Sequence, residues 1–233
     1  MKILVIADIH LDFSDSREKF IIEFFRKIAC KYNKIIILGD FFEFWVGLKN
    51  VLFFEYFNVL AELKKLRDKG IEIIFIEGNH DFNMGDFFTE TLKIQVCEEY
   101  YSMNVNSKKF LFLHGDTINL KEDRFYSFLR LFLRSKFVKF LMNNIPAYMI
   151  LKIAKKFSST SRKYLYKDFD LKRVIDNYEK CADFDFIISG HYHLNFNYKN
   201  FYILGDWFDN FNYIEITESG DMEYKIFYPG DLS

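Results

Sequence analysis

The chain has 233 residues, half of them hydrophobic, and a formal net charge of −1. This length fits one large domain, or a domain with an insertion, with ample material for a core. The three cysteines are widely spaced and form no C-x-x-C, which excludes a disulfide framework and a thiolate zinc site. No apolar run reaches the ~18–20 residues of a membrane span. We therefore expect a protein that is soluble or lies on a membrane surface.

The first part of the chain alternates between predicted strands and helices. Short apolar runs predict strands over 2–7, 34–38 and 71–76, and apolar residues at helical spacing predict helices over 16–31 and 50–69. The N-terminal residues lead directly into the first strand, so we expect no signal peptide. This β-α-β-α-β order predicts a parallel sheet with right-handed crossovers.

The later part of the chain is predicted to add further strands and to close the fold with antiparallel pairs. The predicted elements are a short helix at 86–93, strands at 99–105 and 109–113, a helix at 168–180, a strand at 184–188 and closing strands at 196–204, 213–217 and 222–228, with Gly220 in a hairpin turn.

Residues 124–167 form a basic segment. It holds eleven Lys and Arg residues and no Asp or Glu, which leaves a net charge of −12 on the rest of the chain. Its apolar residues predict helices over 125–142 and 147–157, whose faces could enclose acyl chains while the basic groups meet anionic headgroups or substrate phosphates. The alternative is a helical cap with its apolar side on the core and its charges solvated. The basic residues concerned are Arg130, Arg134, Lys139, Lys152, Lys155 and Lys156.

All five histidines lie in short clusters flanked by Asp, Asn or Gly. The clusters are Asp8-Ile9-His10, Gly78-Asn79-His80-Asp81, His114-Gly115-Asp116 and Gly190-His191-Tyr192-His193, and Gly39-Asp40 adds a carboxylate. Each follows the C-terminal end of a predicted strand, which is the edge at which open α/β sheets bind ligands. Because imidazole and carboxylate are natural ligands of divalent transition metals, this pattern predicts a metal-dependent hydrolase.

The clusters supply the parts of a two-metal site. Two divalent ions about 3.5–4 Å apart form the usual clamp for in-line attack on phosphorus. Asp40 is placed to bridge the two ions. Asp8 and His10 suit one ion, and each ion can take one of the two histidines His191 and His193. Asn79 and His114 suit the other ion. Taken singly, each cluster could be a turn with a satisfied histidine, but five clusters in this order favour the metal site.

The order D-x-H, G-D, G-N-H-D, a single His and G-H-x-H resembles the calcineurin-like metallophosphoesterase superfamily over residues 8–193. The resemblance implies an α/β fold of one domain over 1–233, a four-layer α/β/β/α sandwich with a helical cap insertion at about 121–167. It also implies two divalent ions, often Mn²⁺, and the catalytic residues Asn79, His80 and Asp81. His80 would be a phosphate ligand or general acid oriented by Asp81. The implied ligands are Asp8, His10, Asp40 and His193 for one metal and Asp40, Asn79, His114 and His191 for the other.

Further segments resemble the UDP-2,3-diacylglucosamine pyrophosphatases of the lipid A pathway, chiefly G-D-F-F-E-F-W at 39–45 and L-G-D-W at 204–207. That family hydrolyses its substrate to UMP and 2,3-diacylglucosamine 1-phosphate. The resemblance implies a cytoplasmic enzyme, peripheral on the inner membrane, with a UDP-linked diacylglucosamine lipid as partner and neither nucleic acid nor an obligate protein partner. Glu43 is placed to orient a ligand, and Trp45 is expected to pack in the core rather than to stack on the substrate. The expected substrate contacts are Asn79, His80, Asp123, Ser161, Arg162, Lys163 and His191.

His80 departs from this narrower family, whose central members have arginine in that motif and read G-N-R-D. It matches the wider superfamily, so a related phosphoesterase with another substrate stays open, such as a nuclease or nucleotide phosphodiesterase whose basic segment binds phosphodiesters. A non-catalytic scaffold on the same fold is the other alternative. The many Phe, Leu and Ile residues of the basic segment favour a lipid, and the full set of ligand types favours an enzyme.

Overall fold

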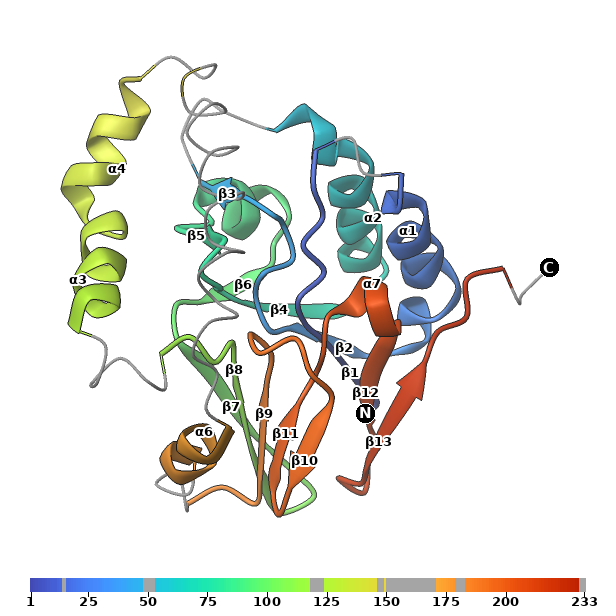
Figure 1. Ribbon diagram of the computed structural model, residues 1–233. Helices are drawn as coiled ribbons and strands as arrows, with labels where there is room; N and C mark the ends of the chain where they lie inside the picture. Colours follow the sequence, from blue (N-terminus) through green and yellow to red (C-terminus); the bar gives the residue numbers. More distant parts are fainter. Residues whose placement is uncertain are drawn as a thin grey trace.

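Two β-sheets lie face to face at the centre of the computed structural model, and helices cover their outer faces (Figure 1). This is the four-layer α/β/β/α arrangement that the sequence led us to expect, and the prediction is confirmed. The structure describes residues 1–13, 16–47, 53–117, 124–145, 149, 171–178 and 183–230.

The first sheet has six strands in the order β13-β12-β1-β2-β4-β6. β1, β2, β4 and β6 are parallel, with Val5 opposite Ile36 and Ile36 opposite Ile74. β12 and β13 close one edge as an antiparallel hairpin with Gly220 in its turn, as predicted. The strands are β1 (Ile3–Ile6), β2 (Lys34–Ile37), β4 (Glu72–Ile76), β6 (Gln95–Cys97), β12 (Asn212–Ile216) and β13 (Met222–Ile226).

The second sheet has five strands in the order β10-β11-β9-β8-β7. β8, β9 and β11 are parallel, and β7 and β10 run antiparallel at the two edges. The single strand predicted over 196–204 is wrong, because the chain reverses at Lys199, whose φ is 54°, and forms a hairpin. The strands are β7 (Tyr100–Val105), β8 (Lys108–Leu113), β9 (Phe186–Ser189), β10 (Phe196–Tyr198) and β11 (Phe201–Ile203).

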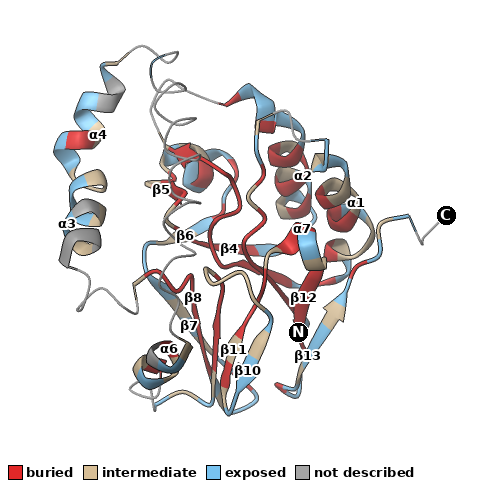
Figure 2. Ribbon diagram, in the orientation of Figure 1, coloured by how far each residue is buried: buried red, intermediate tan, exposed pale blue. Residues whose placement is uncertain are grey.

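Apolar side chains fill the interfaces between the layers. Figure 2 shows the buried residues of these layers in red. Val5 and Ile36 from the first sheet meet Phe110 and Ile188 from the second, because alternate residues of each strand point into the space between the sheets. Helices α1 (Glu18–Lys27) and α2 (Phe57–Asp68) pack on the other face of the first sheet. Helix α6 (Leu171–Tyr178) packs on the outer face of the second sheet.

The segment predicted as one helix over 125–142 is two helices, α3 (Arg124–Leu133) and α4 (Lys136–Asn143). The interruption has a local cause, since the Ser135 hydroxyl accepts a hydrogen bond from the Val138 amide at 3.2 Å and caps the second helix. Apart from residue 149, the predicted helix over 147–157 lies outside the described residues, and so do Lys152, Lys155 and Lys156. None of the helices in the described part of the chain has the length and apolar character needed to cross a bilayer.

Several short elements complete the described structure, among them a parallel pair of two-residue strands that sequence reasoning did not foresee. This pair, β3 and β5, joins the segment after Asp40 to the segment after His80. The short elements are β3 (Trp45–Val46), β5 (Asp81–Phe82), α7 (Trp207–Asn210), 3-10 turns at Ala29–Lys31 and Phe54–Tyr56, and a π-helical turn at Phe87–Thr91, where a short helix was predicted.

Candidate metal centre

The five Asp, Asn and His clusters follow the C-terminal ends of five strands, as predicted. Asp8 follows β1, Asp40 follows β2, Asn79 follows β4, His114 follows β8 and His191 follows β9. Their donor atoms form three groups in which all atoms lie within 4.8 Å of one another. The groups are Asp8, His10 and His193; His10, Asp40 and His80; and Asp40, His114 and His191.

Five of these residues have left-handed backbone conformations. The φ values are 49° for Asp8, 46° for His10, 48° for Asp40, 74° for His191 and 53° for His193. Such conformations cost a non-glycine residue about 1–3 kcal/mol and cluster at functional sites. Here they occur at residues whose donor atoms converge on the centre.

Two glycines allow these loops to approach one another. A Cβ atom on Gly78 would collide with the carboxylate of Asp40, and one on Gly190 would lie 2.5 Å from Asp8 Oδ2. Both positions therefore require glycine for close packing around the carboxylates.

The Asp40 carboxylate lies between the two halves of the centre. Its Oδ1 accepts a hydrogen bond from the His80 amide at 2.9 Å. Its Oδ2 lies 3.7 Å from His10 Nε2 and 3.4 Å from His114 Nε2. This is the position that a bridging ligand requires.

The ring nitrogens face one another in pairs. His10 Nε2 lies 3.1 Å from His193 Nε2, and His114 Nε2 lies 3.2 Å from His191 Nδ1. Two nitrogen lone pairs at this distance repel each other unless a proton or a cation lies between them. The donor set therefore fits divalent cations, because these bind several imidazole and carboxylate groups at once.

The tautomer of His114 supports the same conclusion. Its Nδ1 lies 2.8 Å from the Leu38 carbonyl oxygen, which can only accept, so Nδ1 carries a proton. In the neutral ring, Nε2 then presents a lone pair toward Asp40 Oδ2 and toward Asn79 Oδ1 at 3.0 Å. A cation among these acceptors satisfies all of them.

Burial and charge shift the pKa values of the centre strongly. Burial lowers the pKa values of His114 and His10 because it disfavours the charged rings. The attraction of Asp40 outweighs this effect for His114, and the attraction of Glu43 and Asp40 outweighs it for His10. The pKa of His114 is raised to about 10 and that of His10 to about 9. Burial, together with the charge of His114, lowers the pKa of His191 to about 3. Positive charge thus compensates the buried carboxylates, a role that divalent cations fill equally well.

Further groups hold the far nitrogens of the rings. His10 Nδ1 lies 3.4 Å from Glu43 Oε2, as expected for an orienting carboxylate, and His80 Nδ1 lies 2.9 Å from the Glu43 carbonyl oxygen. His193 Nδ1 lies 3.5 Å from Asp206 Oδ2. Such outer partners fix the orientation and basicity of ligating histidines. We did not anticipate this role for Asp206, although its position in the L-G-D-W segment was a signal.

The expected role of Asp81 in orienting His80 is corrected. The Glu43 carbonyl, and not the Asp81 carboxylate, holds His80 Nδ1. The buried Asp81 carboxylate instead accepts four backbone N–H groups, because the adjoining turns direct their amides at it. The donors are the amides of Asp40, Phe41, Phe42 and Gly78, at 2.7–3.2 Å.

Four of the expected substrate contacts, Asp123, Ser161, Arg162 and Lys163, lie outside the described residues. Arg130 and Arg134, two of the basic residues considered for headgroup contacts, instead form ion pairs with Asp116 and Glu77.

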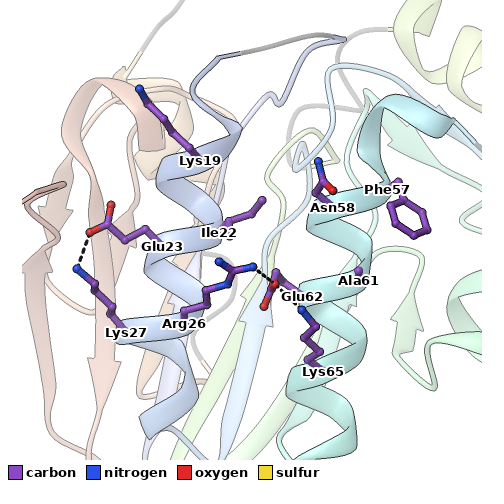
Figure 3. A pocket seen from close by; sticks show the side chains of 10 residues that line it. All are labelled: Lys19, Ile22, Glu23, Arg26, Lys27, Phe57, Asn58, Ala61, Glu62 and Lys65. Carbon is purple, nitrogen blue, oxygen red and sulfur yellow. Dashed lines mark hydrogen bonds and ion pairs between the residues drawn. The ribbon is translucent and has the colours of Figure 1, made fainter.

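A groove of about 520 Å³ between α1 and α2 shares no residue with the metal centre (Figure 3). Five of its charged groups form ion pairs: Arg26 and Lys65 both bind Glu62, and Lys27 binds Glu23 at 2.9 Å. Of these pairs, Arg26–Glu62 joins the two helices, and the other two lie within one helix each.

Two packed sheets that carry imidazoles and carboxylates at their strand ends define a metal-dependent hydrolase. Residues 1–195 match the calcineurin-like phosphoesterase family, and the chain belongs to this family. It is similar to UDP-2,3-diacylglucosamine hydrolase of Histophilus somni (strain 129Pt), with 29% identity over 94% of this chain and 97% of that protein. It is also similar to UDP-2,3-diacylglucosamine hydrolase of Vibrio vulnificus (strain CMCP6), with 27% identity over 98% and 99% of the two chains. Among solved structures, vacuolar protein sorting 29 from Cryptosporidium parvum has a TM-score of 0.48 and 12% identity, over 99% of this chain and 93% of that one.

Proposed function

We propose that this protein hydrolyses the pyrophosphate bond of UDP-2,3-diacylglucosamine and releases UMP and 2,3-diacylglucosamine 1-phosphate, a step of the lipid A pathway. The observation that carries the proposal is the similarity to enzymes named for this substrate over 94% of the chain and 97% of the relative. The segment 39–45, which resembles that family, also supports it. It contributes Asp40 to the metal centre and places Glu43 behind His10 and His80.

The proposed cofactors are two divalent ions, with Mn²⁺ as the expected metal. Asp8, His10, Asp40 and His193 would hold one ion, and Asp40, Asn79, His114 and His191 the other. The donor groups on either side of Asp40 support this division. When bound, the ions supply Lewis-acid polarisation of a phosphoryl group and compensate the charge that develops on it.

His80 and Asn79 are the proposed groups that act on the substrate directly. Because the Glu43 carbonyl oxygen accepts from His80 Nδ1, Nε2 is the nitrogen that would act on the substrate, and it would donate a hydrogen bond or a proton to a phosphoryl oxygen in the doubly protonated imidazolium form. Asn79, whose Oδ1 lies 3.0 Å from His114 Nε2, would help to stabilise charge on the phosphoryl group. Asp81 would act through the backbone, by holding the turn that contains Asp40.

The outer surface of α3 and α4 supports a lipid substrate. Its large apolar side chains are strongly exposed, at 68% for Phe128, 70% for Leu131, 63% for Phe137 and 66% for Phe140. Exposed apolar patches of this kind mark sites that bind lipids, membranes or other proteins. We infer that this surface meets acyl chains or the cytoplasmic face of the inner membrane, with the enzyme peripherally bound. Contacts from Asp123, Ser161, Arg162 and Lys163 remain predictions.

The proposal is tested by measuring UMP release from UDP-2,3-diacylglucosamine in detergent micelles, with and without Mn²⁺. We expect release that depends on Mn²⁺ and is faster than hydrolysis of UDP-glucose or bis(p-nitrophenyl) phosphate. Asp40→Ala should release no UMP. Asp68→Ala, which removes an exposed carboxylate from α2, should behave like the wild type. Faster cleavage of simple nucleotides or nucleic acid than of the lipid nucleotide would assign a different phosphoesterase activity.

A further inference from the structure

Helix α3 has two opposed faces. Phe128, Leu131 and Phe132 are 68%, 70% and 47% exposed. Arg130 and Arg134, the latter just after the helix, are one turn apart, and each lies about 200° around the helix axis from Phe128 and Phe132, respectively, at ~100° per residue. The side chains of the two arginines are only 9% and 14% exposed. One face of α3 thus points outward, and the arginine side faces the loops of the sandwich. Figure 1 shows the helix at the side of the molecule.

Arg134 binds the loop that follows β4. Its Nη1 pairs with the Glu77 carboxylate, and its Nη2 donates to the Gly78 carbonyl oxygen at 2.9 Å. The guanidinium also lies 5.5 Å from the centre of the Phe82 ring. Glu77 is only 3% exposed, and its other oxygen accepts from the Met84 amide at 3.0 Å. Arg134 therefore clamps both ends of the loop that carries Asn79 and His80.

Arg130 binds the loop that follows β8. Its Nε donates to Asp116 Oδ2 at 3.1 Å, and its Nη2 donates to the Glu98 carbonyl oxygen at 3.3 Å. Asp116 is 6% exposed and lies two residues after His114. Arg130 therefore joins the His114 loop to the start of β7.

The two arginines act on the same half of the centre, because Asn79 and His114 are the proposed ligands of one metal. Glu77 and Asp116 are both buried, so loss of either arginine would remove a cation that pairs with a buried carboxylate. Lysine cannot replace the paired contacts of Arg134, because a single ammonium does not reproduce the fork of a guanidinium.

We propose that Arg130 and Arg134 are positioning residues that hold the loops of His114 and Asn79 in the geometry needed to bind one metal of the pair. Helix α3 thereby joins the exposed apolar surface to the metal centre through one element. The lipid identity of what meets that surface rests on the proposed function, whereas the positioning role concerns the metal centre alone.

The experiment compares wild type, Arg134→Ala, Arg134→Lys and Arg130→Ala. Mn²⁺ binding is measured by titration calorimetry, and kcat and KM are measured on bis(p-nitrophenyl) phosphate, which has no acyl chain. Loss of an outer partner of a metal ligand costs about 10–100-fold in metal affinity or activity. We expect losses of this size in the affinity for one of two Mn²⁺ ions and in kcat, with KM within about twofold of wild type. Arg134→Lys should fall between wild type and Arg134→Ala.

Arg67→Ala is the matched control. Arg67 also binds two carbonyl oxygens, those of Lys93 at 2.8 Å and Ile71 at 2.6 Å, but at the opposite end of β4. It should lower the free energy of unfolding without changing Mn²⁺ binding or kcat.

Wild-type Mn²⁺ binding and kcat in folded Arg134→Ala and Arg130→Ala would overturn the positioning role. Loss of activity on the lipid nucleotide alone, with ester turnover and Mn²⁺ binding intact, would also overturn it, because the arginines would then serve only the substrate surface. If Arg134→Ala does not fold, Arg134→Lys supplies the same measurements. A wild type that hydrolyses the ester but not the lipid nucleotide would refute the proposed substrate. The arginine variants could still be compared with the wild type in Mn²⁺ binding and ester hydrolysis.

Discussion

Replacement of Asp81 by asparagine should weaken the fold strongly, because its carboxylate is the acceptor for four backbone amides. Oδ1 accepts from Asp40 at 2.9 Å and from Gly78 at 3.0 Å. Oδ2 accepts from Phe41 at 2.7 Å and from Phe42 at 3.2 Å. Burial and the charge of Asp40 raise the pKa of Asp81 to about 8, so the comparison is made at pH 9, where the carboxylate is ionised. The ionised carboxylate satisfies all four donors, whereas asparagine turns one oxygen into an NH₂ group that accepts nothing. Asp81→Asn therefore leaves two N–H groups facing another donor.

The size of the effect follows from the burial of the site. A hydrogen bond to a charged group contributes about 1.5–3 kcal/mol, so the loss of two predicts about 3–6 kcal/mol. Asp81 is 0% exposed, so water cannot replace the lost acceptor. Urea unfolding followed by tryptophan fluorescence measures the change in the free energy of unfolding.

Asp221→Asn serves as the control for this substitution. Asp221 accepts hydrogen bonds from Ser219 and Lys108, but its side chain is 69% exposed. We expect no measurable change in its unfolding midpoint. A loss below about 1 kcal/mol for Asp81→Asn, less than a single charged hydrogen bond, would refute the reasoning. It would mean that the carboxyl is protonated in the folded protein or that the amides find other acceptors.

Three further predictions concern the core and the metal centre. Phe24→Ala should lower the free energy of unfolding by about 3–5 kcal/mol, because Phe24 is fully buried; a urea midpoint equal to that of the wild type would contradict this. Asp40→Ala should abolish Mn²⁺-dependent turnover and weaken Mn²⁺ binding in calorimetry, since Oδ2 lies between His10 and His114; full activity would exclude a bridging role. In the metal-free protein, the raised pKa values of His10 (about 9) and His114 (about 10) stabilise the fold fully below pH 6.5, and this stabilisation is lost as the pH rises through 9–10. Because Mn²⁺ must displace these protons, calorimetry should show proton release and an affinity for Mn²⁺ that rises with pH. A constant affinity between pH 6 and 9 would contradict this prediction.

The strands that carry the site could be predicted because their signals are local. The largely apolar runs at 34–38 and 71–76 are typical of strands that are buried on both faces. They form β2 and β4 close to the predicted bounds. Two predictions failed where a local detail outweighed the pattern. Lys199 reverses the chain within 196–204, and the cap at Ser135 divides 125–142 into two helices.

The contacts around the site could not be predicted because they join distant parts of the chain. Arg134 and Glu77 are 57 residues apart, and Arg130 and Asp116 lie in different elements. Nothing in the basic segment distinguishes these two arginines from the lysines nearby. The role of Asp81 was also hidden, since an Asp beside a His suggests a direct contact, whereas the folded turns direct four amides at its carboxylate.

The sequence by itself determined the kind of chemistry. Each histidine lies in a short Asp, Asn or Gly cluster directly after a predicted strand, so each cluster can be recognised from its own segment of the chain. Only the tertiary structure decided how the clusters meet, since ring nitrogens 3.1 Å apart belong to residues such as His10 and His193, 183 positions apart in the chain. The tertiary structure also decided which charged side chains support the metal centre, such as Arg130 and Arg134. Burial and ion pairing depend on the packing of the whole molecule and not on any one segment.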